Sequence, residues 1–174
     1  MDKYIDSNMC MLPWSAIETR PDGKYKPCCL YRDELKDPSG KHYNTTEHSI
    51  TEVMNSESMN KLREQFTAGE KPPGCASCWK EEASGKTSKR QHMWYKAPAI
   101  GRLHIGKNIV APRFIDFKLG NICNLKCRIC SPVSSSLWAN EMAKFDPDRK
   151  KYWTKYNKDG MWPKQKNRFY EDLE

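Results

Sequence analysis

Three cysteines, Cys123, Cys127 and Cys130, occupy the run C-N-L-K-C-R-I-C, which has C-x3-C-x2-C spacing. Three thiols on one short loop cannot all pair with each other, and as thiolates they are the soft ligands that hold iron–sulfur clusters. On a four-iron cube, three protein ligands leave one iron open, and an open iron is a place for chemistry. We therefore expect an iron–sulfur site here. The alternatives are a zinc site or an electron-transfer cluster closed by a fourth cysteine, although a lone triple suits zinc poorly.

Five further cysteines form a second constellation nearer the N-terminus. They comprise a C-x2-C pair, Cys75 and Cys78, an adjacent pair, Cys28 and Cys29, and the single Cys10. Four thiolates would close a metal site, because no ligand position would then remain for a substrate. The expected role is electron relay or structural support. A structural zinc site with four cysteine ligands is the alternative, since the C-x2-C pair also serves zinc.

These motifs resemble a known family. The segment Phe114 to Leu119 alternates apolar and polar residues, and a strand followed by C-x3-C-x2-C resembles the opening of a radical S-adenosylmethionine (SAM) enzyme. The N-terminal cysteines resemble the auxiliary-cluster module called SPASM, or its shorter twitch form. That resemblance includes a glycine followed by a cysteine five positions later, as Gly23 is followed by Cys28. It implies an auxiliary [4Fe–4S] cluster held by Cys10, Cys28, Cys75 and Cys78, with Cys29 as the alternative to Cys28.

The family chemistry implies a function. In radical SAM enzymes, SAM binds the open iron of a [4Fe–4S] cluster, here the one on Cys123, Cys127 and Cys130. Reductive cleavage of SAM then yields methionine and a 5′-deoxyadenosyl radical, which abstracts hydrogen from a substrate. The resemblance implies a peptide or protein substrate and an electron donor such as flavodoxin or ferredoxin. Ile129 stands where the family usually has an aromatic residue against the adenine, so it is the candidate adenine contact.

Local patterns predict the elements that position these residues. Ala16 to Thr19 reads as a strand, the turn residues Arg20-Pro21-Asp22-Gly23 follow, and residues 24–26 return as a hairpin. Ser56 begins a helix that carries Met59, Leu62 and Phe66 at helical spacing and runs to Ala68. Ile115, Phe117 and Leu119 should share one face of a strand. Ser134 or Ser135 should cap a helix to about Lys144, and Asp146-Pro147 should open another that carries Tyr152, Trp153 and Tyr156.

Together these elements predict an α/β chain, α+β overall, in three parts. Residues 1–84 form the SPASM/twitch-like module, 85–112 a connector, and 113–174 the first strand, loop and helix of a radical SAM (β/α) barrel. The barrel would need more strand–helix units, and the family's Gly-Gly-Glu segment that holds the SAM amino group is absent. The chain ends at Glu171 to Glu174, about where the second strand should begin. We therefore expect an incomplete barrel, either in a truncated chain that is inactive alone or in a split one that a second chain completes.

Composition indicates the cellular compartment and the possible partners of the chain. Its 174 residues contain no apolar stretch near the roughly 20 residues of a membrane span, and the N-terminus lacks the pattern of a signal peptide. We therefore expect a cytoplasmic protein without a membrane partner, in which clustered cysteines bind metal. The net charge of +8 and the aromatic residues among the lysines of 144–168, such as Trp162, suggest an alternative function. This is a zinc-binding, basic nucleic-acid-binding module, although nucleic acid is not the favoured partner.

Overall fold

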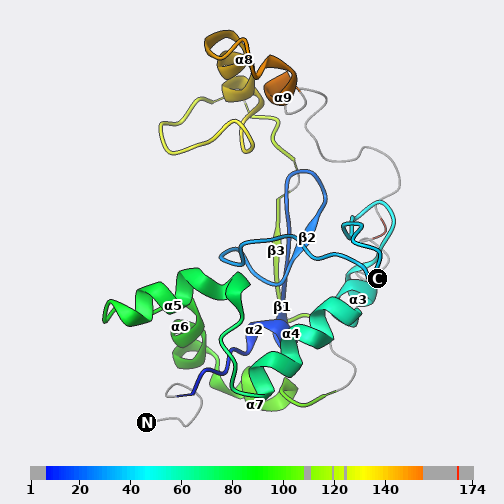
Figure 1. The fold of residues 1–174 in the computed structure, drawn as a ribbon, viewed down its shortest axis with the longest axis vertical. Coiled ribbons are helices and arrows are strands. Elements are labelled where there is room, and N and C mark those ends of the chain that lie inside the picture. Colours follow the sequence, from blue (N-terminus) through cyan, green and yellow to red (C-terminus); the bar gives the residue numbers. More distant parts are fainter. Residues whose placement is uncertain (1–6, 108–110, 119, 124, 155–167, 169–174) are drawn as a thin grey trace.

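The computed structural model describes residues 7–107, 111–118, 120–123, 125–154 and 168. Figure 1 shows helices α2 to α7 grouped below a small sheet, with α8 and α9 above it. The mixture of helices with one sheet confirms the predicted α/β class. In chain order the elements are α2 (Leu12–Ser15), β1 (Ala16–Thr19), β2 (Tyr25–Lys26), α3 (Ile50–Met54), α4 (Glu57–Thr67), η1 (Pro73–Cys75), α5 (Ala76–Ala83), α6 (Lys89–Lys96), α7 (Pro98–His104), β3 (Phe114–Phe117), α8 (Ser136–Phe145) and α9 (Lys150–Thr154).

The predicted hairpin is confirmed in β1 and β2, which pair antiparallel with Glu18 opposite Lys26. The turn closes where the Gly23 N–H donates to the Arg20 carbonyl at 2.9 Å. Gly23 has a φ of +79°, which glycine adopts without the strain that a Cβ would bring. The turn therefore directs the chain back along β1 towards Cys28.

Strand β3 forms the other edge of the sheet, whose order is β2-β1-β3. It runs parallel to β1, with Glu18 opposite Asp116. That Ile115 and Phe117 share one face stays a prediction; Phe114 and Phe117 pack against the core, whereas Ile115 is exposed. Ile115 borders an open hollow beside this edge strand, which explains its exposure. Leu119 lies outside the described residues.

Helix α4 confirms the prediction made from its cap and its apolar spacing. The Ser56 side chain accepts a hydrogen bond from the Met59 N–H, which satisfies one free donor at the helix start. Met59, Leu62 and Phe66 are buried in the main core, which lies between α4 and the sheet. The stripe is therefore core, and it fixes α4 against the segment that carries the first cysteine.

The segment between the two cysteine regions contains two helices, α6 and α7, in place of the predicted connector without helices. Helix α6 begins with a capping box, in which Ser88 and Gln91 each accept a hydrogen bond from the other's backbone N–H. Its Trp94 is almost fully buried. The predicted connector 85–112 thus packs onto the N-terminal region.

Helices α8 and α9 follow the second cysteine region and pack mainly on each other. The predicted cap of α8 is confirmed, since the Ser135 side chain accepts from the Trp138 N–H. Helix α9 begins at Lys150, later than predicted, and the Asp146 carboxylate accepts from the Arg149 N–H at 3.2 Å. Tyr156 and Trp162 lie outside the described residues. Within the described part, no helix is both long and apolar enough to cross a membrane.

Candidate metal centre

Four of the predicted ligands, Cys10, Cys28, Cys75 and Cys78, line one small pocket. They come from four different places in the fold. Cys10 precedes α2, Cys28 follows β2, Cys75 ends η1 and Cys78 lies in the first turn of α5. Residues distant in the sequence therefore converge because the hairpin, α4 and α5 pack around a single core.

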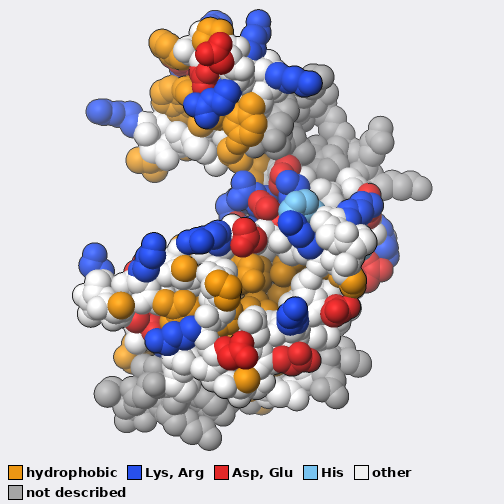
Figure 2. All heavy atoms as spheres, in the orientation of Figure 1, with side chains coloured by type: hydrophobic (Ala, Val, Ile, Leu, Met, Phe, Trp, Pro, Cys, Tyr) orange, Lys and Arg blue, Asp and Glu red, His pale blue; other side chains and the backbone are white. Residues whose placement is uncertain are grey.

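The pocket is otherwise mainly apolar, with Leu12, Phe66 and Trp79 among its walls. Hydrophobic side chains gather in the hollow between α5 and α4 on the face seen in Figure 2. Cys10 and Cys78 are buried, and Cys28 and Cys75 are half-buried. Such a pocket excludes water from the sulfur atoms and suits a group that carries its own positive charge.

Without a bound cation, the environment of this pocket disfavours ionisation of its thiols. Burial raises the pKa of Cys10 well above its usual value, and the neighbouring sulfur atoms of Cys28, Cys75 and Cys78 raise it further. Burial likewise raises the pKa of Cys75 to about 12, with Cys28 and Cys78 adding to the effect. Four thiolates become stable together where metal ions neutralise them, so the donor set fits a cluster.

The spacing of the sulfur atoms also bears on which metal fits. Within the described residues, one group of three side chains has its ligand atoms all within 4.8 Å of one another, and it consists of Glu18, Cys29 and Asp116. No three of the four pocket sulfur atoms are therefore that close to one another. A tetrahedral zinc with Zn–S bonds of about 2.3 Å would hold its sulfur atoms roughly 3.8 Å apart. No three of the four sulfur atoms therefore stand at the spacing of one bound zinc ion.

The structure separates the two adjacent cysteines Cys28 and Cys29. Cys28 faces the four-cysteine pocket, whereas Cys29 is exposed and accepts a hydrogen bond from Lys89 Nζ at 2.8 Å. Burial raises the pKa of Cys28, while the N–H groups of Leu30 and Tyr31 lower it by hydrogen bonding to its sulfur. The geometry therefore groups Cys28, and not Cys29, with the other three thiols.

Helix α6 holds the segment that carries Cys10. The buried Arg90 donates through Nη1 to the carbonyls of Ser7 at 2.7 Å and Met9 at 2.9 Å, and Trp94 Nε1 donates to the same Met9 carbonyl at 3.1 Å. Arg90 also forms an ion pair with Glu82 at 2.8 Å. Burial alone would raise the pKa of Glu82, but its hydrogen bonds with Arg90 and Ser88 lower it overall.

Sequence reasoning missed Arg90 and Trp94, although both support the site. The signal that would have found α6 is the pair Ser88 and Gln91, which has capping-box spacing. Arg90 also borders the pocket directly and lies over the Trp79 ring at 5.4 Å. Its charge is therefore placed to offset negative charge on a group bound by the four cysteines.

Gly74 allows the C-x2-C segment to approach Tyr31 closely. A Cβ at Gly74 would lie 2.3 Å from the Tyr31 ring, so the ring fits only against a residue without a side chain. The Arg32 N–H also donates to the Gly74 carbonyl at 2.9 Å. Burial raises the pKa of Tyr31, and the nearby thiol of Cys75 raises it further. The contact therefore joins the region after Cys28 to the segment that carries Cys75.

The second cysteine region, Cys123, Cys127 and Cys130, lies on a loop between β3 and α8. Cys127 is exposed, and the other two are half-buried. Desolvation raises the pKa of Cys130, and the adjacent Cys127 and Cys123 raise it further. The loop therefore presents three neighbouring sulfur atoms near the surface, in contrast to the enclosed pocket.

The start of α8 holds this loop in place. Ser135 Oγ donates to the Leu125 carbonyl at 3.0 Å, and Trp138 Nε1 donates to the Cys127 carbonyl at 2.9 Å. The Leu125 N–H also donates to Cys123 Sγ at 3.4 Å. Ile129, the candidate adenine contact, is 96% exposed. It therefore contacts almost nothing else in the described part of the chain.

Comparison with known proteins finds a similarity for one part of the chain. Residues 10–79 match the family model SPASM, described as an iron–sulfur cluster-binding domain. No curated protein and no solved structure matches the chain. The matched range contains all four cysteines of the enclosed pocket and ends before the loop of Cys123, Cys127 and Cys130. Residues 10–79 are thus similar to SPASM domains, which bind an iron–sulfur cluster.

Proposed function

We propose that this chain is a radical SAM protein with two iron–sulfur sites. An auxiliary [4Fe–4S] cluster would bind to Cys10, Cys28, Cys75 and Cys78, and a SAM-binding cluster to Cys123, Cys127 and Cys130. When loaded, the second cluster supplies the electron for cleavage of SAM to a 5′-deoxyadenosyl radical. The observation that carries this proposal is the pairing of a closed four-thiol pocket with an exposed three-thiol loop in one chain.

The auxiliary site is supported by the SPASM match and by the pocket itself. Four protein thiolates leave no open iron, so this site would store or relay electrons. Its apolar walls limit access of water, and Arg90 contributes a buried positive charge. Hydrogen bonds and burial around such a cluster set its reduction potential.

The SAM-binding site is supported by the three-thiol loop and its exposure. An iron without a protein ligand needs space for a second molecule, and the exposed side chain of Ile129 beside Cys130 offers an apolar surface for an adenine. The hydrogen bonds from Ser135 and Trp138 fix the loop backbone while leaving Cys127 accessible. These residues would therefore position the cluster and admit SAM.

The sheet offers a position for further strands of a (β/α) barrel. Strand β3 is an edge strand, and in the described residues it pairs with β1 alone. The outer edge of a parallel strand pair is a place where further parallel strands can add. We propose that strands from outside the described residues, or from a second chain, extend the sheet there and complete the SAM pocket.

The proposed setting follows from the thiols and from the family chemistry. All eight cysteines are free, as expected in a reducing compartment such as the cytoplasm. We propose a peptide or protein as substrate and a flavodoxin or ferredoxin as electron donor. These partners follow from the resemblance to radical SAM proteins with SPASM modules.

Anaerobic reconstitution tests the proposal. The full chain should bind about eight iron and eight sulfide, the content of two four-iron clusters. A Cys127→Ser/Cys130→Ser variant should retain about half of the iron, because the enclosed pocket is unchanged. Addition of SAM and dithionite, together with any chain that completes the barrel, should yield 5′-deoxyadenosine with the parent and none with this variant. Loading of zinc alone, without sulfide, would refute the proposal.

A further inference from the structure

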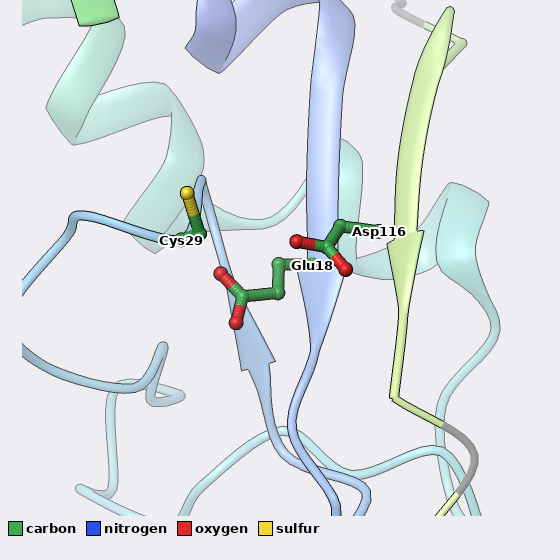
Figure 3. Close-up of side chains that lie close together, drawn as sticks. All are labelled: Glu18, Cys29 and Asp116. Carbon is green, nitrogen blue, oxygen red and sulfur yellow. The ribbon is translucent and has the colours of Figure 1, made fainter. Parts of the chain in front are cut away.

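Three side chains outside the four-cysteine pocket converge beside the sheet. Glu18 on β1, Asp116 on β3 and Cys29 after β2 each bring one ligand atom to within 4.8 Å of the others. Figure 3 shows them grouped on one side of the two strands. They border a hollow of about 190 Å³, which gives an ion a path from solvent. Nothing in the SPASM match or in the proposed function uses these three residues together.

The sheet register makes this convergence a consequence of the fold. Glu18 and Asp116 are partners across the parallel strands, so their side chains leave the same face. Lys26 is the partner of Glu18 on β2, and its Nζ donates to the Cys29 carbonyl at 3.4 Å. The chain after β2 therefore brings Cys29 over the face that carries the two carboxylates.

Glu18 provides the observation that points to a ligand. Its side chain is 4% exposed, and Oε1 pairs with Lys118 at 2.5 Å. Its Oε2 is buried and has no hydrogen-bond partner in the described part of the chain. A buried carboxylate oxygen without a partner is unfavourable, and coordination to a cation would remove that cost.

Two lysines now occupy the places where a cation would be attracted. Lys118 Nζ lies 2.5 Å from Glu18 and 3.3 Å from Asp116, and Lys89 Nζ lies 2.8 Å from Cys29 Sγ. Both side chains are partly exposed, so their ammonium groups can turn into water when a doubly charged ion binds. The lysines therefore compete with the ion and should weaken its binding.

We propose that Glu18, Cys29 and Asp116 form a binding site for one divalent ion of the zinc class. One thiolate and two carboxylates suit a borderline-soft ion, whereas Mg²⁺ and Ca²⁺ favour sets of six or more oxygens. Bond lengths of about 2.0–2.3 Å place tetrahedral ligands roughly 3.5 Å apart. The three ligand atoms lie within 4.8 Å of one another, so binding a tetrahedral ion requires them to move by about 1 Å, which the exposed Cys29 and Asp116 can do. A fourth position remains for water, as in zinc sites with three protein ligands.

Zinc binding to the full chain, after anaerobic loading of iron and sulfide, tests this site. Loading first keeps zinc out of the cluster cysteines. Equilibrium dialysis should then give about one zinc per chain, and X-ray absorption should show one sulfur neighbour at about 2.3 Å together with oxygen neighbours. Cys29→Ser and Asp116→Asn should each lose this zinc while keeping the iron content of the parent. Asp148→Asn, which removes an exposed carboxylate elsewhere, should bind zinc as the parent does.

The lysine variant separates a metal site from a purely structural ion-pair cluster. Lys118→Gln should bind zinc about fivefold more tightly, because it removes the ammonium group that competes with the ion for Glu18 and Asp116. Absence of bound zinc in both the parent and Lys118→Gln would overturn the proposal. Zinc surrounded by sulfur alone would overturn it too, and so would loss of iron in Cys29→Ser, which would assign Cys29 to a cluster. If iron fails to load, the proposed function fails, but this site can still be tested. A zinc ion with one sulfur neighbour that binds the parent and is lost in Cys29→Ser would support the site independently of the proposed function.

Discussion

Replacing Arg90 by alanine is expected to release the N-terminal segment that carries Cys10. Arg90 is 3% exposed, and its guanidinium joins α6 to α5 through Glu82 and to the chain before Cys10 through the Ser7 and Met9 carbonyls. Alanine removes every one of these bonds and leaves the Glu82 carboxylate without its ion-pair partner. The variant should therefore be less stable, and its Cys10 thiol more reactive.

The contacts of Arg90 set the size of this effect. Its two hydrogen bonds to main-chain carbonyls come from a charged donor, which gives about 1.5 kcal/mol each. The pair with Glu82 is largely buried, with side-chain exposures of 4% and 18%. Loss of one partner of a fully buried pair costs about 3–5 kcal/mol, and the partial exposure of Glu82 lowers this to about 1–2 kcal/mol, which adds to the two hydrogen bonds. We therefore expect the free energy of unfolding to fall by about 4–5 kcal/mol.

Urea unfolding of the reduced, metal-free chain measures the loss, and thiol labelling in native buffer measures exposure of Cys10. Arg90→Lys is the matched control, because it keeps the charge but cannot reach both carbonyls and Glu82 at once. It should lose about half as much stability. An Arg90→Ala variant within about 0.5 kcal/mol of the parent, with Cys10 still protected, would refute the idea that α6 holds this segment.

Two further predictions concern the cysteine pocket. Gly74→Ala places a Cβ 2.3 Å from the Tyr31 ring, so the reduced chain should lose about 1–3 kcal/mol in urea unfolding, and adding Tyr31→Leu should restore part of it. No loss in the single variant would contradict this contact. Stability of the metal-free chain should also fall as pH rises, because the folded state raises the pKa of Cys75 to about 12 and so binds the proton more tightly than the unfolded state. The contribution is complete below about pH 9 and lost towards pH 12, and urea midpoints under reducing conditions that rise over this interval would contradict it.

Elements set by neighbouring residues could be predicted from the sequence. The turn at Gly23 depends on local conformation, and α4 follows from the Ser56 cap and the spacing of its apolar residues. Helix α6 was missed because its cap lies in a polar segment with a single buried aromatic residue, Trp94. The pairing of β1 with β3 joins segments far apart in the chain, and no local pattern specifies such a partner.

In the candidate site too, local motifs could be predicted from the sequence, whereas features that depend on packing could not. The sequence identified cysteines with metal-ligand spacing, because C-x2-C and C-x3-C-x2-C are local patterns. It gave no geometric reason to choose between Cys28 and Cys29, since adjacent residues have the same chemistry and differ in direction. The choice depends on the path of the chain after β2, where Lys26 and Lys89 contact Cys29 and leave Cys28 facing the pocket. The role of Arg90 also depends on this packing.

Iron analysis of two adjacent cysteine variants tests the central claim most directly. Cys28→Ser and Cys29→Ser make the same chemical change one residue apart, and after anaerobic reconstitution each is compared with the parent. The four-thiol pocket predicts that Cys28→Ser loses about half of the bound iron and sulfide, whereas Cys29→Ser keeps all of it. Equal iron in both variants, or loss confined to Cys29→Ser, would contradict the assignment of the enclosed pocket as the auxiliary cluster site.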